Sequence, residues 1–362
     1  MHKIIVQVTK PYLPDRVKYK KYIDGIYDRN QLTNHGILVH ELEKRLAEYL
    51  GLEDIILVAN GTLALNIAYR ALEIKNEVIT TPFSFVATTN SLISDGIMPI
   101  FSDINPETFN IEPSLISDKI TAKTTAIVPV HIFGNACEVE ALEEIGKNHN
   151  LKIIYDAAHA FDINYKNKSL LNYGNISALS LHATKLFHTI EGGALIVNDK
   201  TLVQKVRRLI DFGYNKSGLI VDAGINAKMN EFEAAMGLCV LDDIVAIKAN
   251  RKKIFDFYSQ ELGKFLSFQL WNEHATQNYA YFPVVFKDEK QLLKTQKKLN
   301  ENSIFPRRYF YPSLESLSYI NKYQKCENSQ SISERILCLP LYDDLSLDDA
   351  GRITDIIKRC SL

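Results

Sequence analysis

Short apolar runs alternate with amphipathic stretches along the first two-thirds of the chain. Residues 39–50 carry apolar side chains at the spacing of a helix, and this stretch stops at Gly51. Apolar runs that predict strands come at 55–58, 77–80, 98–101, 126–130 and 151–155, with helical stretches between them. This alternation predicts an α/β fold with a mostly parallel sheet between helices. The residues before 39 show no such pattern and predict an irregular start.

Beyond residue 245 the alternation thins. Residues 248–264 predict a charged helix and residues 279–286 predict a strand, while the stretches that begin at 288 and 348 predict amphipathic helices on a short sheet. A chain of 362 residues can bury one large core and a smaller one. We therefore expect a large domain over 1–245, with an N-terminal arm, and a smaller C-terminal α+β domain over 246–362.

The composition of the chain argues against nucleic acid and membranes as partners. The 42 basic and 43 acidic residues nearly cancel, so the chain offers no electrostatic footprint for nucleic acid or an anionic membrane. Residues 1–6 lead too soon into a polar stretch to form an export signal, and no apolar run approaches the length of a membrane span. We expect a cytoplasmic protein. Five cysteines without a Cys-x-x-Cys pair indicate neither a disulfide framework nor a zinc site.

Several ligand-binding motifs are absent or incomplete. His40 and Glu41 resemble the start of a zinc-protease helix, but Lys44 stands where the second histidine belongs, and we expect no metal. Neither a P-loop nor a Gly-x-Gly-x-x-Gly turn occurs, which disfavours nucleotide hydrolases and Rossmann dehydrogenases. Gly61 and Thr62 begin a helix after a strand, an arrangement that suits a phosphate. The alternative is that threonine simply caps the helix.

Lys185 and Asp156 point to a specific cofactor. Lys185 lies just ahead of a Gly192-Gly193 turn, and Asp156 ends a predicted strand, where the carboxyl end of a parallel strand faces the ligand crevice. Pyridoxal phosphate needs a lysine to carry it as an imine and an acidic partner for its pyridine nitrogen. Singly, Lys185 reads as a surface lysine and Asp156 as a helix cap. Together they indicate pyridoxal phosphate chemistry.

A series of motifs along the chain resembles those of the fold-type-I pyridoxal phosphate enzymes, and specifically the DegT-type nucleotide-sugar aminotransferases. The motifs stand at 32–36, 60–65, 81–88, 156–160, 180–185, 191–194 and 224–231. The resemblance spans most of the chain. It implies the α/β fold of a fold-type-I PLP-dependent transferase and pyridoxal 5'-phosphate as cofactor.

The same resemblance assigns roles to individual residues. As catalytic residues, Lys185 would carry the cofactor, Asp156 would pair with the pyridinium nitrogen and His159 would lie near the ring. The other residues expected to bind the cofactor are Asn60, Gly61, Thr62, Phe85, Ser180, His182 and Asn226. The family's asparagine at the position of Asn226 reaches the phosphate from the neighbouring subunit, which implies a homodimer with shared active sites.

Further residues concern the substrate. Arg307, Arg308 and Tyr309 are expected to contact a sugar nucleotide, because arginine pairs well with diphosphate and tyrosine stacks on bases; the alternative is a charged surface loop. Two positions depart from the family pattern. His159 stands where glutamine is frequent, and Lys228 stands where many members have arginine.

The resemblance implies transfer of an amino group from L-glutamate to a nucleotide-linked keto-6-deoxy sugar, in amino-sugar biosynthesis of the O-antigen or lipopolysaccharide kind. The residues of these motifs are most similar to those of enzymes that form dTDP-4-amino-4,6-dideoxyglucose from the 4-keto sugar. Amination of a 3-keto sugar or of a GDP- or UDP-linked 4-keto sugar is one alternative, and a non-catalytic sensor is another. A third, a dehydratase, typically has histidine at the lysine position, and Lys185 argues against it.

Overall fold

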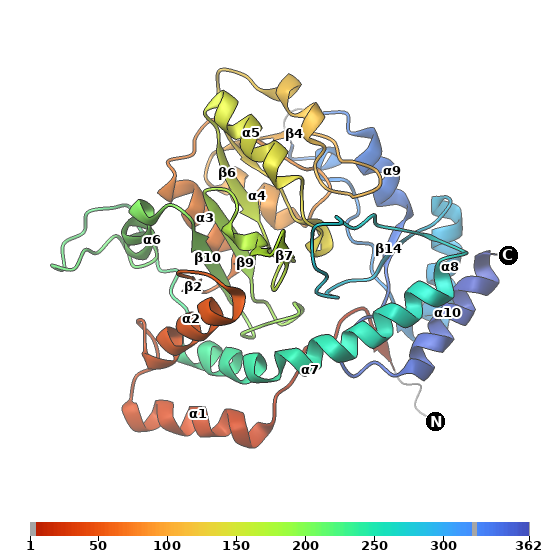
Figure 1. Cartoon of the computed structure of the whole chain (residues 1–362), viewed down its shortest axis with the longest axis horizontal. Helices are drawn as coiled ribbons and strands as arrows, with labels where there is room; N and C mark the ends of the chain where they lie inside the picture. Colours follow the sequence, from red (N-terminus) through yellow and green to blue (C-terminus); the bar gives the residue numbers. More distant parts are fainter. Residues whose placement is uncertain (1–4, 321–323, 362) are drawn as a thin grey trace.

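A seven-stranded sheet forms the centre of the computed structural model, which describes residues 5–320 and 324–361 (Figure 1). The order across the sheet is β2-β10-β9-β6-β5-β3-β4; β10 is antiparallel to both neighbours and the other pairs are parallel. The strands are β2 (Ile56–Val58), β3 (Glu77–Thr80), β4 (Met98–Phe101), β5 (Thr124–Val128), β6 (Lys152–Asp156), β9 (Ile176–Ser180) and β10 (Gly193–Val197). Most of the segment 1–6, for which the sequence predicts no export signal, lies outside the described residues.

Strand side chains alternate between two cores on opposite faces of the sheet. Leu57 and Leu179 belong to one core, whereas Ile56 and Ala178 belong to the other, as expected for side chains that point to opposite faces in turn. The first core is covered by α2 (Ile37–Leu50), α5 (Val139–His149) and the first half of α7 (Glu231–Leu262). The second is covered by α3 (Gly61–Ala71), α4 (Val86–Ser94) and α6 (Val203–Leu209). The sheet therefore lies between two layers of helices.

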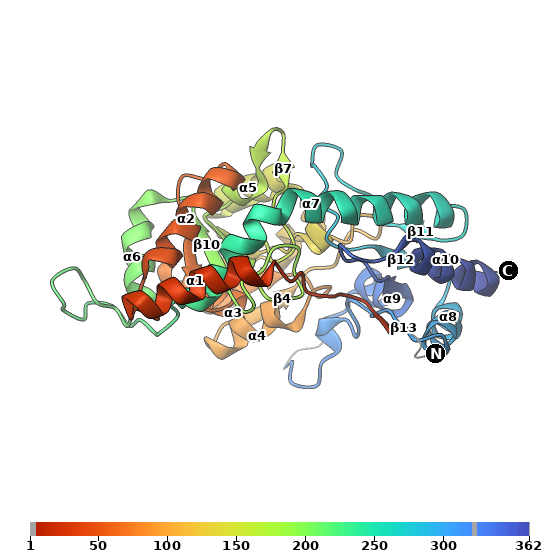
Figure 2. The same ribbon diagram turned by 90° about the horizontal axis from the view of Figure 1, so that it is seen from below.

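The long helix α7 continues from the first core into a third one. Its second half contributes Ile254, Tyr258 and Leu262 to a core that is shared with a small antiparallel sheet and two helices. The elements of this region are β11 (Ser267–Phe268), β12 (Pro283–Val285), β14 (Ile336–Cys338), β13 (Ile304–Phe305), α8 (Glu289–Glu301), α9 (Glu327–Arg335) and α10 (Leu347–Ser361). The domain boundary predicted at 245 falls inside α7, and the division into two domains stays a prediction (Figures 1 and 2).

The expected irregular start is wrong, because α1 (Arg16–Arg29) forms there. Its sequence is mostly polar, and its narrow apolar face, formed by Tyr19, Tyr22, Ile23 and Ile26 at helical spacing and packed on the first core, was overlooked. Contacts with α7 hold it: the hydroxyl of Tyr19 donates to the carbonyl of Phe232 at 3.2 Å, and Lys18 pairs with Asp242 at 2.7 Å. Ahead of α1, β1 (Val6–Gln7) crosses to the far end of the molecule and pairs in parallel with β13 (Figure 2).

Most other predicted elements are confirmed. The predicted strands 77–80 and 98–101 coincide with β3 and β4, and α2 ends at Gly51, whose φ of 65° suits glycine. Residues 248–264 fall almost wholly within α7, which begins much earlier. Of the strand expected over 279–286, only part of the second half forms, as β12. The remaining short elements are β7 (Asn164–Tyr165), β8 (Lys168–Ser169) and 3-10 turns at Pro113–Leu115, Ser117–Lys119, Ile132–Gly134, Leu170–Asn172, Lys200–Leu202 and Leu314–Ser316. Within 5–320 and 324–361, none of the helices has the length and apolar character of a membrane span.

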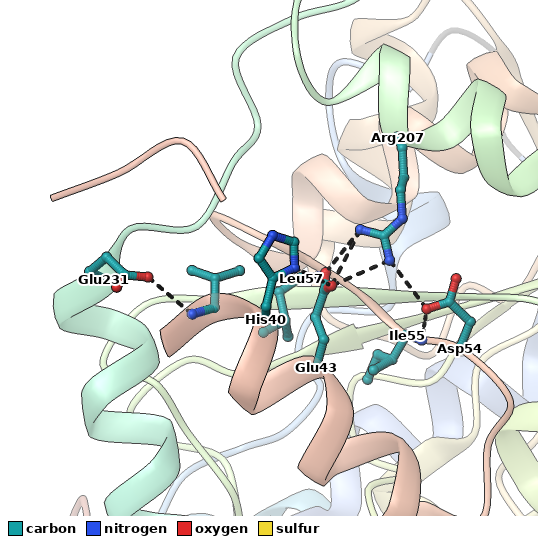
Figure 3. A network of polar contacts seen from close by, with 8 residues as sticks. His40, Glu43, Asp54, Ile55, Leu57, Arg207 and Glu231 are labelled. Atoms are coloured by element: carbon teal, nitrogen blue, oxygen red, sulfur yellow. Dashed lines mark hydrogen bonds and ion pairs between the residues drawn. The ribbon is translucent and has the colours of Figure 1, made fainter. Parts of the chain in front are cut away.

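A buried carboxylate fixes β2 to its surroundings (Figure 3). Oε1 of Glu43 on α2 accepts the backbone N–H of Leu57 at 3.0 Å, and Arg207 on α6 pairs with both Glu43 and Asp54. His40 lies 3.7 Å from the Glu43 carboxylate. Burial raises the pKa of Glu43, and Arg207 and the Leu57 N–H act against that shift. The network holds the strand that leads directly into the turn at Asn60.

Candidate active site

A cavity of about 290 Å³ opens at the carboxyl ends of the central strands, beside the segment around Tyr309. This is the edge of a parallel sheet where ligands bind. The residues predicted for the site that line it are Asn60, Gly61, Thr62, Phe85, Asp156, His159, Ser180, His182, Lys185, Arg307 and Tyr309. Asn226 and Arg308 are not among its lining residues.

The turn between β2 and α3 makes one wall of the cavity. Asn60 is the N-cap of α3, and its Oδ1 accepts the N–H of Leu63 at 2.9 Å, so the cap is Asn60 and not Thr62. A Cβ added to Gly61 would lie 3.0 Å from Cβ of Ser180, which means that a larger residue would fill the space between this turn and β9. An open helix N-terminus beside two hydroxyl side chains is suited to a phosphate.

Asp156 lies at the base of the cavity and is 6% exposed. Its Oδ2 accepts the hydroxyl proton of Thr88 at 2.7 Å, and its Oδ1 accepts the N–H of Ala158 at 3.0 Å. Burial raises the pKa of Asp156, while these two donors and the nearby Lys185 favour the carboxylate. The alternative that Asp156 caps a helix is wrong, because the residues that follow it form a turn and no helix, and the N–H of Ala158 belongs to that turn.

Lys185 reaches into the same cavity from the segment after β9. Its Nζ donates to the hydroxyl of Tyr281 at 3.3 Å, at the long end of the hydrogen-bond range. Burial lowers the pKa of Lys185 from 10.5 to about 8, and Asp156 and Tyr309 partly oppose this effect. The amine can therefore exchange a proton close to neutral pH, as a general acid–base requires.

His159 is a buried, neutral imidazole. Its Nδ1 accepts the backbone N–H of Phe133 at 3.2 Å, and because that N–H can only donate, the ring proton of the neutral form lies on Nε2. Burial and the proximity of Lys185 lower the pKa of His159 well below its usual value. Its ring stacks with those of Phe133 and Phe310, at centroid distances of 6.1 and 5.9 Å. Aromatic contacts thus fix the plane of the imidazole.

Three residues that the sequence singled out lie elsewhere. Arg308 donates to Glu289 at 2.8 Å and to the carbonyl of Glu334 at 3.0 Å, and its guanidinium lies 3.6 Å from the ring centroid of Tyr311. Asn226 is exposed and forms a backbone bridge with Asp211. The side chain of Lys228 is buried and forms an ion pair with the same aspartate. The lysine at this position is therefore bound within its own chain.

Tyr281, Phe310 and Thr88 were missed. Tyr281 and Phe310 line the cavity, and Thr88 bonds the carboxylate of Asp156. Thr88 lies inside the motif 81–88, but nothing in its local sequence distinguishes it from other helix threonines. The contacts of Tyr281 and Thr88 join positions 96 and 68 residues apart, which local patterns do not reveal.

The donor set fits pyridoxal phosphate. An amine, a buried carboxylate and a helix N-terminus that glycine keeps open surround one cavity, as the lysine, pyridine and phosphate contacts of this cofactor require. In the part of the chain that the structure describes, no group of three or more histidine, cysteine or carboxylate side chains is placed to hold a metal ion. All five cysteines are buried and free.

Comparison with known proteins agrees with this geometry. Residues 15–358 match the model of a family described as the DegT/DnrJ/EryC1/StrS aminotransferase family. The chain is 41% identical to a dTDP-4-amino-4,6-dideoxy-D-glucose transaminase of Shigella dysenteriae, over 97% of this chain and 98% of that protein. It is 36% identical to an Escherichia coli protein of the same name, with the same coverage of both chains.

A solved structure has the same fold. DesI, crystallised in the presence of its TDP-sugar product, matches with a TM-score of 0.94 and 28% identity, over 99% of this chain and 93% of that chain. The sheet order, the helical layers and the small C-terminal sheet therefore belong to a known enzyme architecture.

Proposed function

The chain belongs to the DegT/DnrJ/EryC1/StrS aminotransferase family and is a pyridoxal phosphate-dependent sugar transaminase, and from this we propose that it transfers the amino group of L-glutamate to C4 of dTDP-4-keto-6-deoxyglucose. The product would be dTDP-4-amino-4,6-dideoxyglucose. The observation that carries the proposal is the identity of 41% and 36%, over nearly the whole chain, to two transaminases named for that product. The proposed pathway is amino-sugar biosynthesis for a surface polysaccharide such as O-antigen, in the cytoplasm.

In this proposal different residues of the cavity bind the cofactor phosphate, keep its ring protonated and transfer protons. Pyridoxal phosphate supplies an electron sink that stabilises negative charge at the carbon next to the transferred nitrogen. Gly61, Thr62 and Ser180 would hold its phosphate, and Asp156 would keep the pyridine nitrogen protonated. The amine of Lys185, when it is not bound to the cofactor, would take the proton from the α-carbon of the donor and deliver it to C4′ of the cofactor. The same residue would reverse these transfers for the sugar.

His159 and Phe85 would orient the ring. The Nε2 proton of His159 is available for a hydrogen bond, because Nδ1 is occupied by the N–H of Phe133. Phe85 lines the cavity and is 50% exposed, so its face can stack on a planar ligand. His182 bonds Thr184 at 2.8 Å and lies 3.5 Å from Glu191, which ties it to the loop that borders the phosphate site.

Arg307 and Tyr309 would bind the sugar nucleotide. Both line the cavity, and the guanidinium of Arg307 lies 4.8 Å from the ring centroid of Tyr309. Arginine and an aromatic ring suit a diphosphate and the groups attached to it. Arg308, in contrast, is occupied by Glu289 and backbone carbonyls, so its predicted substrate role has no support from the geometry.

A homodimer with shared active sites is part of the proposal. Asn226, the residue expected to reach a phosphate, is exposed and does not line the cavity of its own chain. It follows a loop that projects from the molecule (Figure 1). This loop carries a series of exposed apolar side chains: Phe212, Tyr214, Leu219, Ile220 and Val221. Such a cluster on a soluble enzyme marks a protein contact, and a second copy would cover it while it brings Asn226 to the neighbouring site.

The first test is a visible absorption spectrum of the purified protein with pyridoxal phosphate, before and after L-glutamate is added. Wild type should show a yellow band that glutamate bleaches, and Lys185→Ala should show neither the lysine-dependent band nor measurable turnover. Lys200→Ala, on a surface lysine paired with Glu53, is the control and should behave as wild type. Absence of the band in wild type would refute the proposal.

The sugar is tested separately. Nucleotide-linked 3- and 4-keto sugars with dTDP, GDP or UDP would be offered to the glutamate-treated enzyme, with products identified by mass spectrometry and NMR. Preference for dTDP-4-keto-6-deoxyglucose is expected. Faster amination of a 3-keto sugar, or of a GDP- or UDP-linked sugar, would show that the proposed substrate is wrong. Loss of a sugar hydroxyl would indicate a dehydratase. Failure of every sugar after bleaching would favour the sensor alternative.

A further inference from the structure

The segment 278–281 leads into the cavity without regular secondary structure, yet its backbone is tied down. Asn278 is fully buried, and its Nδ2 donates to the carbonyls of His159 at 3.0 Å and Phe161 at 2.8 Å. Its Oδ1 accepts the N–H of Ala280 at 3.1 Å. One amide side chain therefore joins this segment to the loop that follows β6 and carries His159.

A buried arginine holds the same segment from the other side. Arg251 on α7 is 5% exposed; its Nε donates to the carbonyl of Tyr279 at 3.0 Å and its Nη2 to the carbonyl of Ala280 at 2.7 Å. Burying a guanidinium is costly unless its donors are satisfied. Tyr279 between these anchors has φ of 59°, a conformation that is unfavourable for a residue with a Cβ. The chain thus stabilises a strained backbone two residues before Tyr281.

The side chain that this backbone presents is Tyr281. Its hydroxyl accepts a hydrogen bond from Lys185 Nζ at 3.3 Å. Its ring packs against those of His159 and Phe133, at centroid distances of 4.7 and 5.4 Å. Burial raises the pKa of Tyr281, so the phenol keeps its proton and is uncharged. Rigid support on the backbone and on the ring leaves the hydroxyl in one place.

We propose that Tyr281 is a positioning residue for Lys185, which holds the lysine amine in place when it is free of the cofactor, and that Arg251 and Asn278 hold Tyr281. The inference rests on the proposed role of Lys185. A released amine on a flexible stem has many rotamers, and proton transfer requires one of them. The charged and titratable groups that face Lys185 are Asp156 and Tyr309, which raise its pKa, and His159, whose own pKa Lys185 lowers.

The test measures the proton affinity of Lys185 in the cofactor-free protein. Trinitrobenzenesulfonate would be added between pH 6 and 11, and modification of the peptide that carries Lys185 would be followed by mass spectrometry. Wild type should titrate near pH 8. Tyr281→Phe should move the midpoint down by about 1 pH unit, because the ammonium loses a hydrogen-bond acceptor. Arg251→Lys, which keeps the charge but loses the forked geometry, should move it in the same direction by less.

Tyr279→Phe is the matched control. It removes a hydroxyl two residues away, on a ring that packs 5.4 Å from that of Phe255 on α7. Its midpoint should equal that of wild type. An unchanged midpoint in Tyr281→Phe would overturn the proposal, and so would an equal shift in Tyr279→Phe, since loosening of the segment would then be the cause.

Kinetics of the cofactor-loaded enzyme give a second readout. Tyr281→Phe should lower kcat about tenfold while KM for L-glutamate stays within about twofold, because the variant misplaces a proton-transfer group and leaves binding intact. A change confined to KM would contradict a role toward Lys185. The titration needs no substrate or turnover, so its result is distinguishable from a failure of the proposed function, which the missing cofactor band of wild type would reveal.

Discussion

Burial alters the protonation of three side chains that meet in the cavity. It lowers the pKa of Lys185 and His159 and raises that of Asp156. Hydrogen bonds from Thr88 and Ala158 counteract the effect at Asp156, because they favour the charged form. Perturbed groups concentrated in one cavity are typical of active sites, where each protonation state serves a step of the reaction.

The depressed pKa of Lys185 should cost stability. The folded protein releases this proton above about pH 8, whereas the unfolded chain keeps it until about 10.5. Between these values the unfolded state binds more protons, so wild type gains stability as pH rises. Without cofactor, Lys185→Met should therefore be more stable than wild type by about 1–3 kcal/mol at pH 7, with the difference shrinking from pH 8 and absent above 10.5. Urea unfolding over this pH range measures it, and a constant difference would contradict the explanation.

At the level of residues, the sequence predicts those parts of the site that sit in local motifs. Asp156 ends an apolar strand and Gly61 follows one, so both could be assigned to the same edge of the sheet. Lys185 was identified by its neighbours in the motif. The partners of these residues were not predictable, because Thr88 and Tyr281 reach them only through the tertiary fold.

Among the helices, α2 depends on a cap from a different part of the chain. Gly36, its N-cap, has no side chain, and the carboxylate of Glu231 at the start of α7 accepts the N–H groups of Leu38 at 3.1 Å and Val39 at 3.0 Å. A Cβ on Gly36 would lie 2.3 Å from Cδ of Glu231. Glycine is therefore required for the carboxylate to approach, and the start of one helix is completed by the start of another.

Glu231→Ala should destabilise the protein by about 2–4 kcal/mol, because it leaves two buried donors without an acceptor. The measurement is urea unfolding, with the transition midpoint lowered and the slope unchanged. Glu48→Ala, on an exposed carboxylate of α2, is the control and should change stability by less than about 0.5 kcal/mol. Equal effects of the two substitutions would show that the cap contributes nothing.

The strands of this protein are easier to predict from its sequence than two of its helices. The five strands predicted between residues 55 and 155 were found to within two residues, since burial on both faces of the sheet requires continuous apolar runs. Strand β9 was not predicted, and the strand predicted over 279–286 was too long. Helix α1 was missed because its apolar face is narrow: Tyr22, Ile23 and Ile26 pack on the core, but most other residues of the helix are polar. The first half of α7 was missed for the opposite reason: nearly every residue over 234–241 is buried, which erases the helical period.

For the whole molecule, the projecting loop between α6 and α7 is the strongest indication of a partner. Figures 1 and 2 both show it extending away from the helices that cover the central sheet. The sequence motif near Asn226 suggested a shared site, but the apolar surface beside it could be recognised only once the loop was seen to be exposed. Periodicity does not distinguish apolar side chains in a core from those at a contact between chains.

The loop predicts an oligomeric state that a single substitution can change. Wild type should elute in size-exclusion chromatography with light scattering at twice the mass of one chain. Ile220→Asp should shift it toward the monomer and lower activity at least about tenfold, because a buried unpaired charge opposes association. Leu293→Asp, on an exposed leucine of α8, is the control. A dimer that tolerates Ile220→Asp would place the contact elsewhere.

The pairing of Val6 with Ile304 constrains the order in which parts of the chain can fold during synthesis. A ribosome releases the chain from its beginning, so the strand at Val6 emerges with no partner and must wait until β13 has been made. The central sheet is complete long before that, since its last strand ends at Val197. Docking of the N-terminal strand is thus among the final folding events, and a nascent chain arrested before residue 304 should leave it open to proteolysis.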